Sequence, residues 1–521
     1  MKPSLRALLL IILIAGCFTG NRSHAQATDP GLIAATNLLK DAVKPQADGS
    51  HNALLLGLRE FEDPALLPLF NALSGSPYLS MRIHGRLGAA ALSPKRRIDL
   101  TTLAEIEDQR ELVQVLSAAI DDDLIDNKAM ATLLTWAGLD LPMRQAIALR
   151  LMASGGEVDT TAFRESLQIE LNDELNAAKL LQYALAALLF AETGDGAGHT
   201  ALDKLASLYS DSAEAVIGQT LDAAMRQGMA SAGKLGISIA KDAKRGPALR
   251  LLAIQSAMRL GATGAAQTWQ AMYLAEQSTA QRIRLAMITL DAANQVDPVV
   301  FDTLANGGEW IGHIANAGRA ISTQNNDLAV AFKPLIATGQ PLSVQWVVTY
   351  CQRSEPKQGP DLLELVIEHH FAGPKHHRGR MTRAASDAAT SLCEIYPEQA
   401  NKRLAALLDI NHPRTAGAGD DVQYLQRRQL VLFGIARTNN KTIKPLAESI
   451  EPDTFNDFTT QALRLFIRAR HGAALTDKEW LRISDIVQGV GQLDRSMRLQ
   501  LGWAYLKHKG EAKRAIAKAL R

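Results

Sequence analysis

The amino-acid sequence predicts an all-α protein, built as an α-solenoid of roughly a dozen antiparallel helix pairs. Apolar residues recur with the period of a helix along almost the whole chain, and the two-residue period of a strand is nearly absent. Alanine and leucine, both strong helix formers, are abundant. The helical segments are about 10 to 18 residues long and end in short breaks rich in Gly, Pro, Asp or Ser. Each helix pair therefore takes about 40 residues, a spacing typical of helical repeats.

The composition narrows the classes of protein further. Of the 521 residues, 47% are hydrophobic, which is enough for a folded core and excludes global disorder. With 37 glycines and 3 cysteines, the chain fits neither a collagen nor a disulfide scaffold. The net charge of +2, without a large basic block, argues against a dedicated nucleic-acid binder. We therefore expect no nucleic-acid partner.

The first 27 residues are predicted to be a signal peptide that directs export. Lys2 and Arg6 precede an apolar run at residues 7–18, which is too short to span a membrane as a helix. Cleavage after Ala27 releases the mature chain, whereas a lipobox that ends at Cys17 leads to an acylated N-terminus and membrane attachment. Both alternatives predict a protein of the bacterial cell envelope, either periplasmic, lipid-anchored or secreted. Neither leaves a transmembrane helix after the signal is removed.

Particular residues place the starts and stops of helices. Asp63-Pro64, Asp297-Pro298 and Glu451-Pro452-Asp453 each offer an N-cap followed by a proline in the first turn. Glycines follow many segments and are expected to end them, for example Gly75, Gly138, Gly228, Gly261 and Gly339.

The chain is predicted to contain one repeat array over residues 28–355 and its continuation over residues 359–521. A polar turn cluster at residues 354–360 separates the two parts. Residues 411–421 form the longest glycine-containing stretch, and long loops on a repeat array often lie at a binding face.

Four segments share one pattern. An apolar residue is followed by an arginine and then by small residues at helical spacing, and most of the segments also contain a leucine after the arginine. The pairs are Met81-Arg82, Met143-Arg144, Leu249-Arg250 and Met497-Arg498. This pattern resembles the second helix of a HEAT repeat, most fully over residues 63–92. The small residues are expected to let neighbouring helices approach closely, and the arginines are expected to link adjacent repeats through carbonyls or carboxylates.

The C-terminal end is similar to a tetratricopeptide repeat instead. The similarity lies in Leu501-Gly502-Trp503-Ala504-Tyr505, Gly510 and Ala515, with one residue too many before Ala515. Both families are α-solenoids, so either resemblance implies the same fold class. The alternative is a generic helical bundle, but about 490 residues of short helices are hard to enclose in one core.

Two cysteines, Cys351 and Cys393, remain in the body of the chain. In an oxidising compartment they are candidates for a disulfide. The other interpretation is two buried thiols that act as small apolar side chains.

Four histidines gather at residues 369–377 and are the only metal-ligand candidates that stand out: His369, His370, His376 and His377. Imidazole suits Zn, Cu or Ni, but the spacing matches no specific site, and adjacent histidines on a helix point about 100° apart. The other interpretations are a solvated helix end and a patch for anions or acidic glycans. We expect no metal and no cofactor here.

Two further motifs are interpreted as local structure. Residues 121–126 lack the glycine and glutamate of a calcium loop and are read as an N-capping run before a helix that starts at Asn127. Residues 194–198 are glycine-rich, but no strand precedes them, so they are read as a loop.

The function predicted from the sequence is that of an exported, non-catalytic helical-repeat scaffold that binds a protein partner in the bacterial cell envelope. The alternative is a helical-toroid enzyme that acts on a cell-wall or extracellular polysaccharide. Only 5% of the residues are aromatic, which argues against a cleft lined for sugar stacking. Trp269, Tyr273, Trp310 and Trp346 are expected to be large core fillers.

Overall fold

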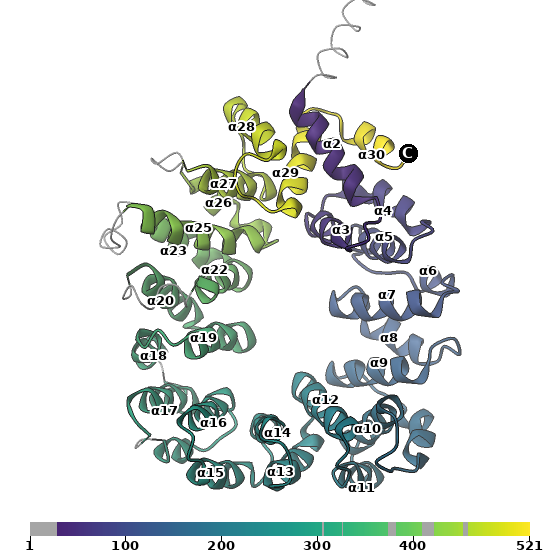
Figure 1. Ribbon diagram of the computed structural model, residues 1–521, viewed down its shortest axis with the longest axis vertical. Helices are drawn as coiled ribbons and strands as arrows, with labels where there is room; N and C mark the ends of the chain where they lie inside the picture. Colours follow the sequence, from purple (N-terminus) through teal and green to yellow (C-terminus); the bar gives the residue numbers. More distant parts are fainter. Residues whose placement is uncertain (1–28, 305–306, 326, 373–381, 409–420, 452–456) are drawn as a thin grey trace, which may run out of the picture. The chain divides into compact units, whose positions relative to one another are not determined.

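The computed structural model describes residues 29–304, 307–325, 327–372, 382–408, 421–451 and 457–521. Within these ranges the chain folds into α-helices and short 3-10 helices and forms no strand, which confirms the predicted all-α class (Figure 1). The contacts divide the chain into two compact units. Unit 1 combines residues 1–124 with residues 366–521, and unit 2 contains residues 125–365.

The first part of unit 1 contains α2 (Pro30–Ala42), α3 (Ser50–Glu60), η1 (Pro64–Leu66), α4 (Leu67–Ser74), α5 (Leu79–Ala91), α6 (Leu100–Ala104) and α7 (Gln109–Asp121). Its second part contains α22 (Thr382–Ile395), α23 (Pro397–Leu408), α25 (Asp421–Arg437), η5 (Lys441–Ile443), α26 (Lys444–Ser449), α27 (Phe458–Arg470), α28 (Asp477–Gln488), α29 (Arg495–His508) and α30 (Ala512–Ala519).

Unit 2 contains α8 (Asn127–Leu134), α9 (Leu141–Ala153), η2 (Thr160–Gln168), α10 (Ala177–Glu192), α11 (Gly196–Leu205), α12 (Asp211–Gln227), η3 (Ala230–Ala232), α13 (Gly233–Lys241), α14 (Pro247–Arg259), α15 (Ala265–Ala275), α16 (Thr279–Asp291), η4 (Pro298–Asp302), α17 (Glu309–Ser322), α18 (Leu328–Ala337) and α19 (Pro341–Ser354). The next helix, α20 (Gly359–Ala372), crosses the boundary between the two units.

The helix starts follow the predicted capping residues. Asp63, Asp126 and Asp297 each accept a hydrogen bond from a backbone N–H of the following turn, at 3.0, 2.8 and 2.9 Å. Residues 121–126 thus provide the expected N-cap for α8. Gly228 ends α12 in the left-handed conformation, at φ 69°, which an L side chain rarely adopts.

Small residues let neighbouring helices approach closely, as the HEAT-like pattern predicts. A Cβ atom on Gly85 of α5 would lie 2.3 Å from the backbone nitrogen of Ser74, and one on Gly88 would lie 2.3 Å from the Phe70 ring. Gly198 likewise has no room for a side chain, because its Cβ would lie 2.1 Å from the Ala191 nitrogen. Residues 194–198, which we read as a loop, therefore include the first turn of α11, packed against α10.

The helix pairs of unit 2 are shorter than the average spacing predicted from the sequence. The second helices of successive pairs, α14, α16, α17 and α19, end at residues 259, 291, 322 and 354. This spacing of 31 or 32 residues differs from the predicted average of about 40. The last residues of these four helices occupy equivalent positions in successive pairs, and the C-terminal ends of the helices lie next to one another.

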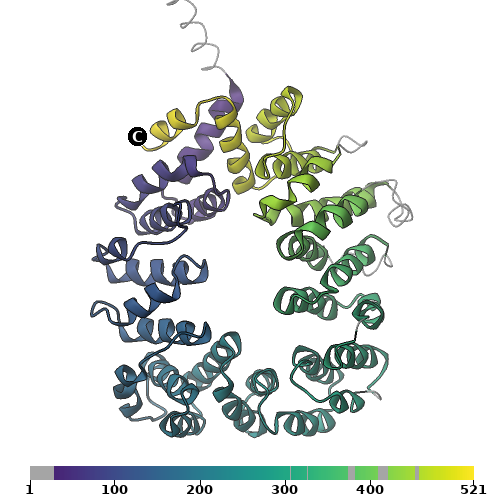
Figure 2. The ribbon, with the colours of Figure 1, turned by 180° about the vertical axis from the view of Figure 1, so that it is seen from behind.

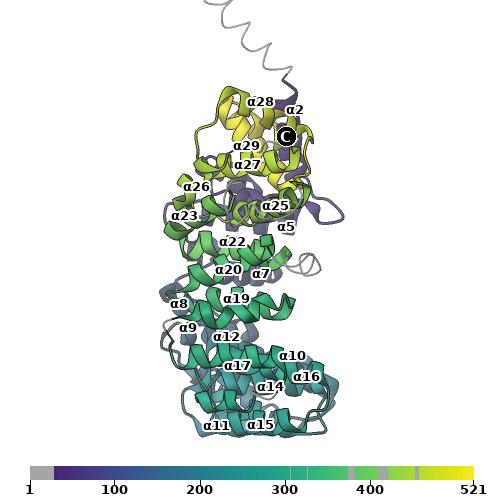
Figure 3. The ribbon, with the colours of Figure 1, turned by 90° about the vertical axis from the view of Figure 1, so that its left-hand side faces the viewer.

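The two ends of the described chain pack together in unit 1. Helix α2 contacts α28, α29 and α30, and Figures 1 and 2 show α2 beside α29 and α30 from opposite sides. The same helix lies with α28 and α29 in Figure 3. The Tyr505 hydroxyl donates to Asp29 at 2.8 Å, and the Trp503 indole donates to Asp63 at 2.8 Å. Side chains more than 400 positions apart therefore share one core.

The predicted division of the array differs from the compact units. A turn does separate α19 from α20 within the polar cluster at residues 354–360. The boundaries of the compact units, however, fall after Leu124 and after Leu365, and residues 29–124 pack with the C-terminal part of the chain. Among the described residues, no helix combines the length and apolar character needed to cross a membrane.

Candidate functional site

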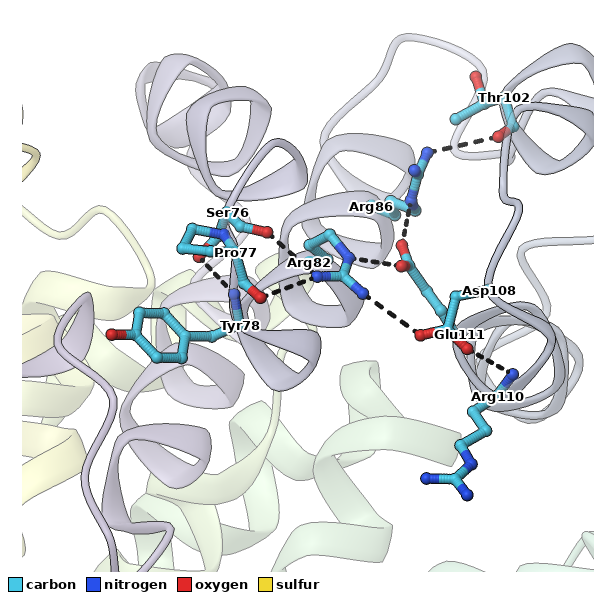
Figure 4. A network of polar contacts seen from close by, with 9 residues as sticks. All are labelled: Ser76, Pro77, Tyr78, Arg82, Arg86, Thr102, Asp108, Arg110 and Glu111. Atoms are coloured by element: carbon cyan, nitrogen blue, oxygen red, sulfur yellow. Dashed lines mark hydrogen bonds and ion pairs between the residues drawn. The ribbon is translucent and has the colours of Figure 1, made fainter.

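The arginines of the HEAT-like pattern link neighbouring helices. Arg82 of α5 donates to the carboxylate of Glu111 and to the carbonyls of Ser76 and Pro77, at 3.2 and 3.1 Å (Figure 4). Arg86 donates to the other oxygen of Glu111 at 2.7 Å, and the Glu111 side chain is only 3% exposed. These bonds tie α5 to α7 and to the turn before α5, so the network is structural.

The same position of later helices serves the same purpose in most cases. Arg250 donates to the Ala240 carbonyl at 3.0 Å, and Arg498 donates to the Val487 carbonyl at 2.9 Å. Each bond joins the second helix of a pair to the C-terminal end of the first. Arg144 differs, because its side chain forms no such bond to a described residue, whereas Arg498 forms one through Nη2. The motif therefore explains packing and provides no ligand site.

A polar pocket of about 210 Å³ lies in unit 2 at the C-terminal ends of α14, α16, α17 and α19. The 31- or 32-residue repeat places these helix ends next to one another. The lining residues are Arg259, Leu290, Asp291, Ala293, Asn294, Ile321, Tyr350, Arg353 and Ser354. Two arginines and one aspartate are the charged groups of this lining, and we take the pocket as the candidate functional site.

Asp291 holds the two arginines of the pocket in place. Its side chain is 6% exposed and forms ion pairs with Arg259, at 3.6 Å, and with Arg353. Gln255 donates to the same carboxylate at 3.1 Å, and Trp346 donates to it at 3.3 Å. Asp291 therefore accepts three hydrogen bonds, from Gln255, Trp346 and Arg353, and its charge also attracts Arg259.

The ionisable groups of the pocket keep fixed charges near neutral pH. Burial by itself raises the pKa of Asp291, but the hydrogen bond and the charge of Arg353 outweigh it and hold that pKa below its ordinary value. Burial lowers the pKa of Arg259, with Asp291 opposing, yet a guanidinium stays protonated in proteins. Burial raises the pKa of Tyr350 to about 12, so its hydroxyl remains a donor. The residues that line the pocket therefore have one more positive charge than negative charge, and Asp222, outside the lining, also acts on Arg259 through its charge.

An aromatic stack supports one wall of the pocket. Trp346 stacks on Tyr350 with ring centroids 5.2 Å apart, and Phe332 stacks on Tyr350 at 5.9 Å. Tyr350 is 7% exposed and Phe332 is fully buried. These rings come from α18 and α19 and pack the two helices together, and Arg353 lies one turn after Tyr350 on α19.

A second hollow, of about 200 Å³, lies in unit 1 between α2, α29 and α30. Its cationic lining residues, Lys40, Arg514 and Lys518, are exposed. Charges in such positions are screened by solvent and salt and are not held in one geometry. The unit 2 pocket is the better defined site for this reason.

The predicted metal ligands do not form a cluster in the described part of the chain. His369 and His370 lie in the last turn of α20, while His376 and His377 lie outside the described residues. His370 is only 2% exposed, so this end of the helix is not fully solvated as one of our interpretations required. No group of three or more His, Cys, Asp or Glu side chains within the described ranges is arranged to hold a metal ion.

Cys351 and Cys393 are free, buried thiols. Cys351 belongs to α19 in unit 2, and Cys393 belongs to α22 in unit 1. Burial raises the pKa of the Cys351 thiol to about 12 and also raises that of Cys393, so neither is activated as a thiolate. The lipidation candidate Cys17 and residues 411–420 of the predicted loop at residues 411–421 lie outside the described residues, whereas Asp421 begins α25.

The sequence analysis missed the residues of the pocket, although a signal was present. Arg259 and Asp291 are the final residues of α14 and α16, and Arg353 is the penultimate residue of α19. Charged residues therefore lie at the last or penultimate position of three of these four helices, whereas α17 ends at Ser322. Their common position becomes visible only when the local period of 31 or 32 residues is known.

Comparison of the chain with protein-family models, with curated proteins and with solved structures finds no match in any of the three.

Proposed function

We propose that the protein is an exported helical-repeat scaffold that binds a protein partner in the bacterial cell envelope. Export rests on the N-terminal signal, with either Ala27 as the last residue removed or Cys17 as an acylated anchor. Partner binding rests on the helical-repeat organisation, which presents rows of helix ends along an extended surface.

The observation that carries the binding role is the chemistry of the unit 2 pocket. Acid–base catalysis uses a group that exchanges a proton near the working pH. Asp291 has a lowered pKa, the pKa of Tyr350 is about 12, and the two arginines remain charged. This set is suited to recognising a ligand by fixed charges and hydrogen bonds.

Crosslinking in intact cells tests the proposal. The mature chain with an affinity tag at its C-terminus is crosslinked, purified and analysed by mass spectrometry, and a captured protein is then purified and titrated against it. A reproducible envelope partner that binds the purified chain directly is the expected result. A matched chain with residues 2–27 removed should stay in the cytoplasm and lose that partner.

Two results would overturn the proposal. One is a chain that fractionates with the cytoplasm when its N-terminal segment is intact. The other is the release of reducing sugar ends from purified cell wall, which would favour the glycan-cleaving enzyme.

A further inference from the structure

We infer that the pocket at the ends of α14, α16, α17 and α19 is a carboxylate-binding site, for an acidic side chain or a free C-terminus of a peptide partner. The inference rests on the proposed function, since it assigns the chemistry by which one surface of the scaffold recognises its partner. A free small carboxylate has the same chemistry as these groups of a peptide. The experiment below distinguishes the two kinds of ligand.

The first argument is the surplus of donors over acceptors. Arg353, Gln255 and Trp346 donate hydrogen bonds to Asp291, and Arg259 forms an ion pair with the same carboxylate at 3.6 Å. Each guanidinium has five N–H groups, and the two arginine side chains are 27% and 33% exposed. The N–H groups that Asp291 does not take face solvent and can donate to a ligand acceptor in place of water, and a negatively charged acceptor also reduces the surplus positive charge of the lining.

The second argument is that the arginines are not needed to cap the helix ends. Basic residues in a last turn often serve the exposed carbonyls and the helix dipole. Here the following backbone already does so, because Ala262 donates to the Ala257 carbonyl at 3.0 Å and Glu355 donates to the Cys351 carbonyl at 3.1 Å. The same holds for α17, where Asn325 donates to the Ala320 carbonyl at 2.8 Å.

The third argument is the shape and the walls of the pocket. A guanidinium matches a planar carboxylate through two parallel hydrogen bonds, which gives geometric selectivity as well as charge attraction. Leu290, Ile321 and the Tyr350 ring provide apolar surface beside the charges. The volume of about 210 Å³ accommodates a carboxylate with its methylene stem, and Asn294 adds a neutral polar group at the exposed side.

The test uses the full mature chain and three pairs of probes. The first pair is a fluorescent peptide with one central glutamate and blocked ends, and its glutamine counterpart. The second pair is a neutral peptide with a free C-terminus, and its C-terminal amide. Glutarate and its diamide form the third pair and report on free small carboxylates. Binding is measured by fluorescence anisotropy for the peptides and by calorimetry for glutarate.

We expect at least one acid probe to bind at least tenfold more tightly than its amide, a ratio that corresponds to about 1.4 kcal/mol. Asn294→Asp places a negative charge in the pocket without removing a partner of Asp291, and it should weaken that binding at least tenfold. Arg353→Gln should weaken it similarly. The exposed Gln277→Glu, which makes the same chemical change outside the pocket, is the control and should leave binding unchanged.

The outcomes separate the inference from the proposed function. Equal binding of the acid and amide members of every pair overturns the inference, as does unchanged acid binding in folded Asn294→Asp. Tighter binding of inorganic phosphate than of any carboxylate also overturns it. If Asn294→Asp still captures the cellular partner with unchanged affinity, the pocket is not the recognition site, whereas the scaffold role stands.

Discussion

Burial acts differently on the ionisable side chains of this protein according to the charges around them. Asp291 is buried against two arginines and stays ionised, whereas His471 is buried beside cations and stays neutral. Burial, followed by Lys441 and Arg470, lowers the pKa of His471 to about 3. The His471 side chain is 3% exposed, so its protonation would place an additional positive charge in the core of unit 1.

The first prediction concerns the loss of stability in acid. In the unfolded chain His471 has an ordinary pKa of about 6.5, so between pH 6.5 and about 3 the unfolded state binds a proton that the native state does not. The free energy of unfolding of unit 1 should therefore fall as the pH falls. His471 should contribute a decrease of up to about 1.4 kcal/mol per pH unit. His471→Gln should make the decline shallower.

The measurement is urea denaturation at pH 7, 6 and 5, followed by tryptophan fluorescence. The slope of stability against pH is compared between the wild type and the variant, so a constant loss from the substitution cancels. Leu55→Ala, which destabilises unit 1 without removing an ionisable group, is the control and should keep the wild-type slope. Identical slopes for His471→Gln and the wild type would contradict the prediction.

At the scale of elements, glycines decide which helices touch. A Cβ atom on Gly85 would lie 2.3 Å from the backbone of α4, whereas nothing lies within 4 Å of a Cβ atom on Gly312 in α17. Both glycines occupy helix interiors, so both carry the same intrinsic cost to the helix. Only their surroundings differ, and this makes them a matched pair.

The second prediction is that the two alanine substitutions have opposite effects. Gly85→Ala should lower the free energy of unfolding by about 1–3 kcal/mol, because α4 and α5 must move apart. Gly312→Ala should raise it by about 0.5–1 kcal/mol, because alanine is the better helix former and meets no neighbour. Thermal and urea denaturation of the two variants check the signs. A stabilising Gly85→Ala would show that the α4–α5 contact is looser than the structure describes.

Much at this scale follows from the sequence, because caps and close contacts leave local signals. The N-caps Asp63, Asp126 and Asp297 were predictable, since each needs only its own following turn. The linking role of Arg82 was predictable from its place before the small residues of α5. The all-α class followed from periodicity alone.

The candidate site was not predictable, because its residues meet only through stacking of repeats. Arg259, Asp291 and Arg353 belong to three different helix pairs, and each looks like an ordinary charged helix end when taken singly. The sequence also contains a more conspicuous feature that lies outside this site. The histidines from His369 to His377 are conspicuous by composition, yet His370 is buried in the described part of α20.

At the scale of the whole molecule, unit 1 depends on both ends of the described chain. Chain order keeps α2 and α29 more than 400 residues apart, yet Gly502 of α29 lies directly against Ala35 of α2. A Cβ atom on Gly502 would lie 3.1 Å from that of Ala35, and Ala35 is fully buried. Such contacts between distant segments carry a large loop-closure entropy and are expected to form late in folding.

The third prediction follows from this contact. Ala35→Leu adds volume where α2 meets α29, and overpacking of this kind costs about 1–3 kcal/mol. Amide hydrogens of α28 and α29 should therefore exchange faster, by about tenfold for each 1.4 kcal/mol of lost stability. These helices lie more than 430 positions from the substituted residue in the chain. Helices of unit 2 such as α10, whose core does not include α2, should keep their exchange rates. Ala104→Leu makes the same change at an exposed position of α6 in unit 1 and should leave α28 and α29 unchanged. Faster exchange spread evenly over both units would show that the chain unfolds as one cooperative body. Unchanged exchange in α29 would show that the two ends of the described chain are not packed together in solution.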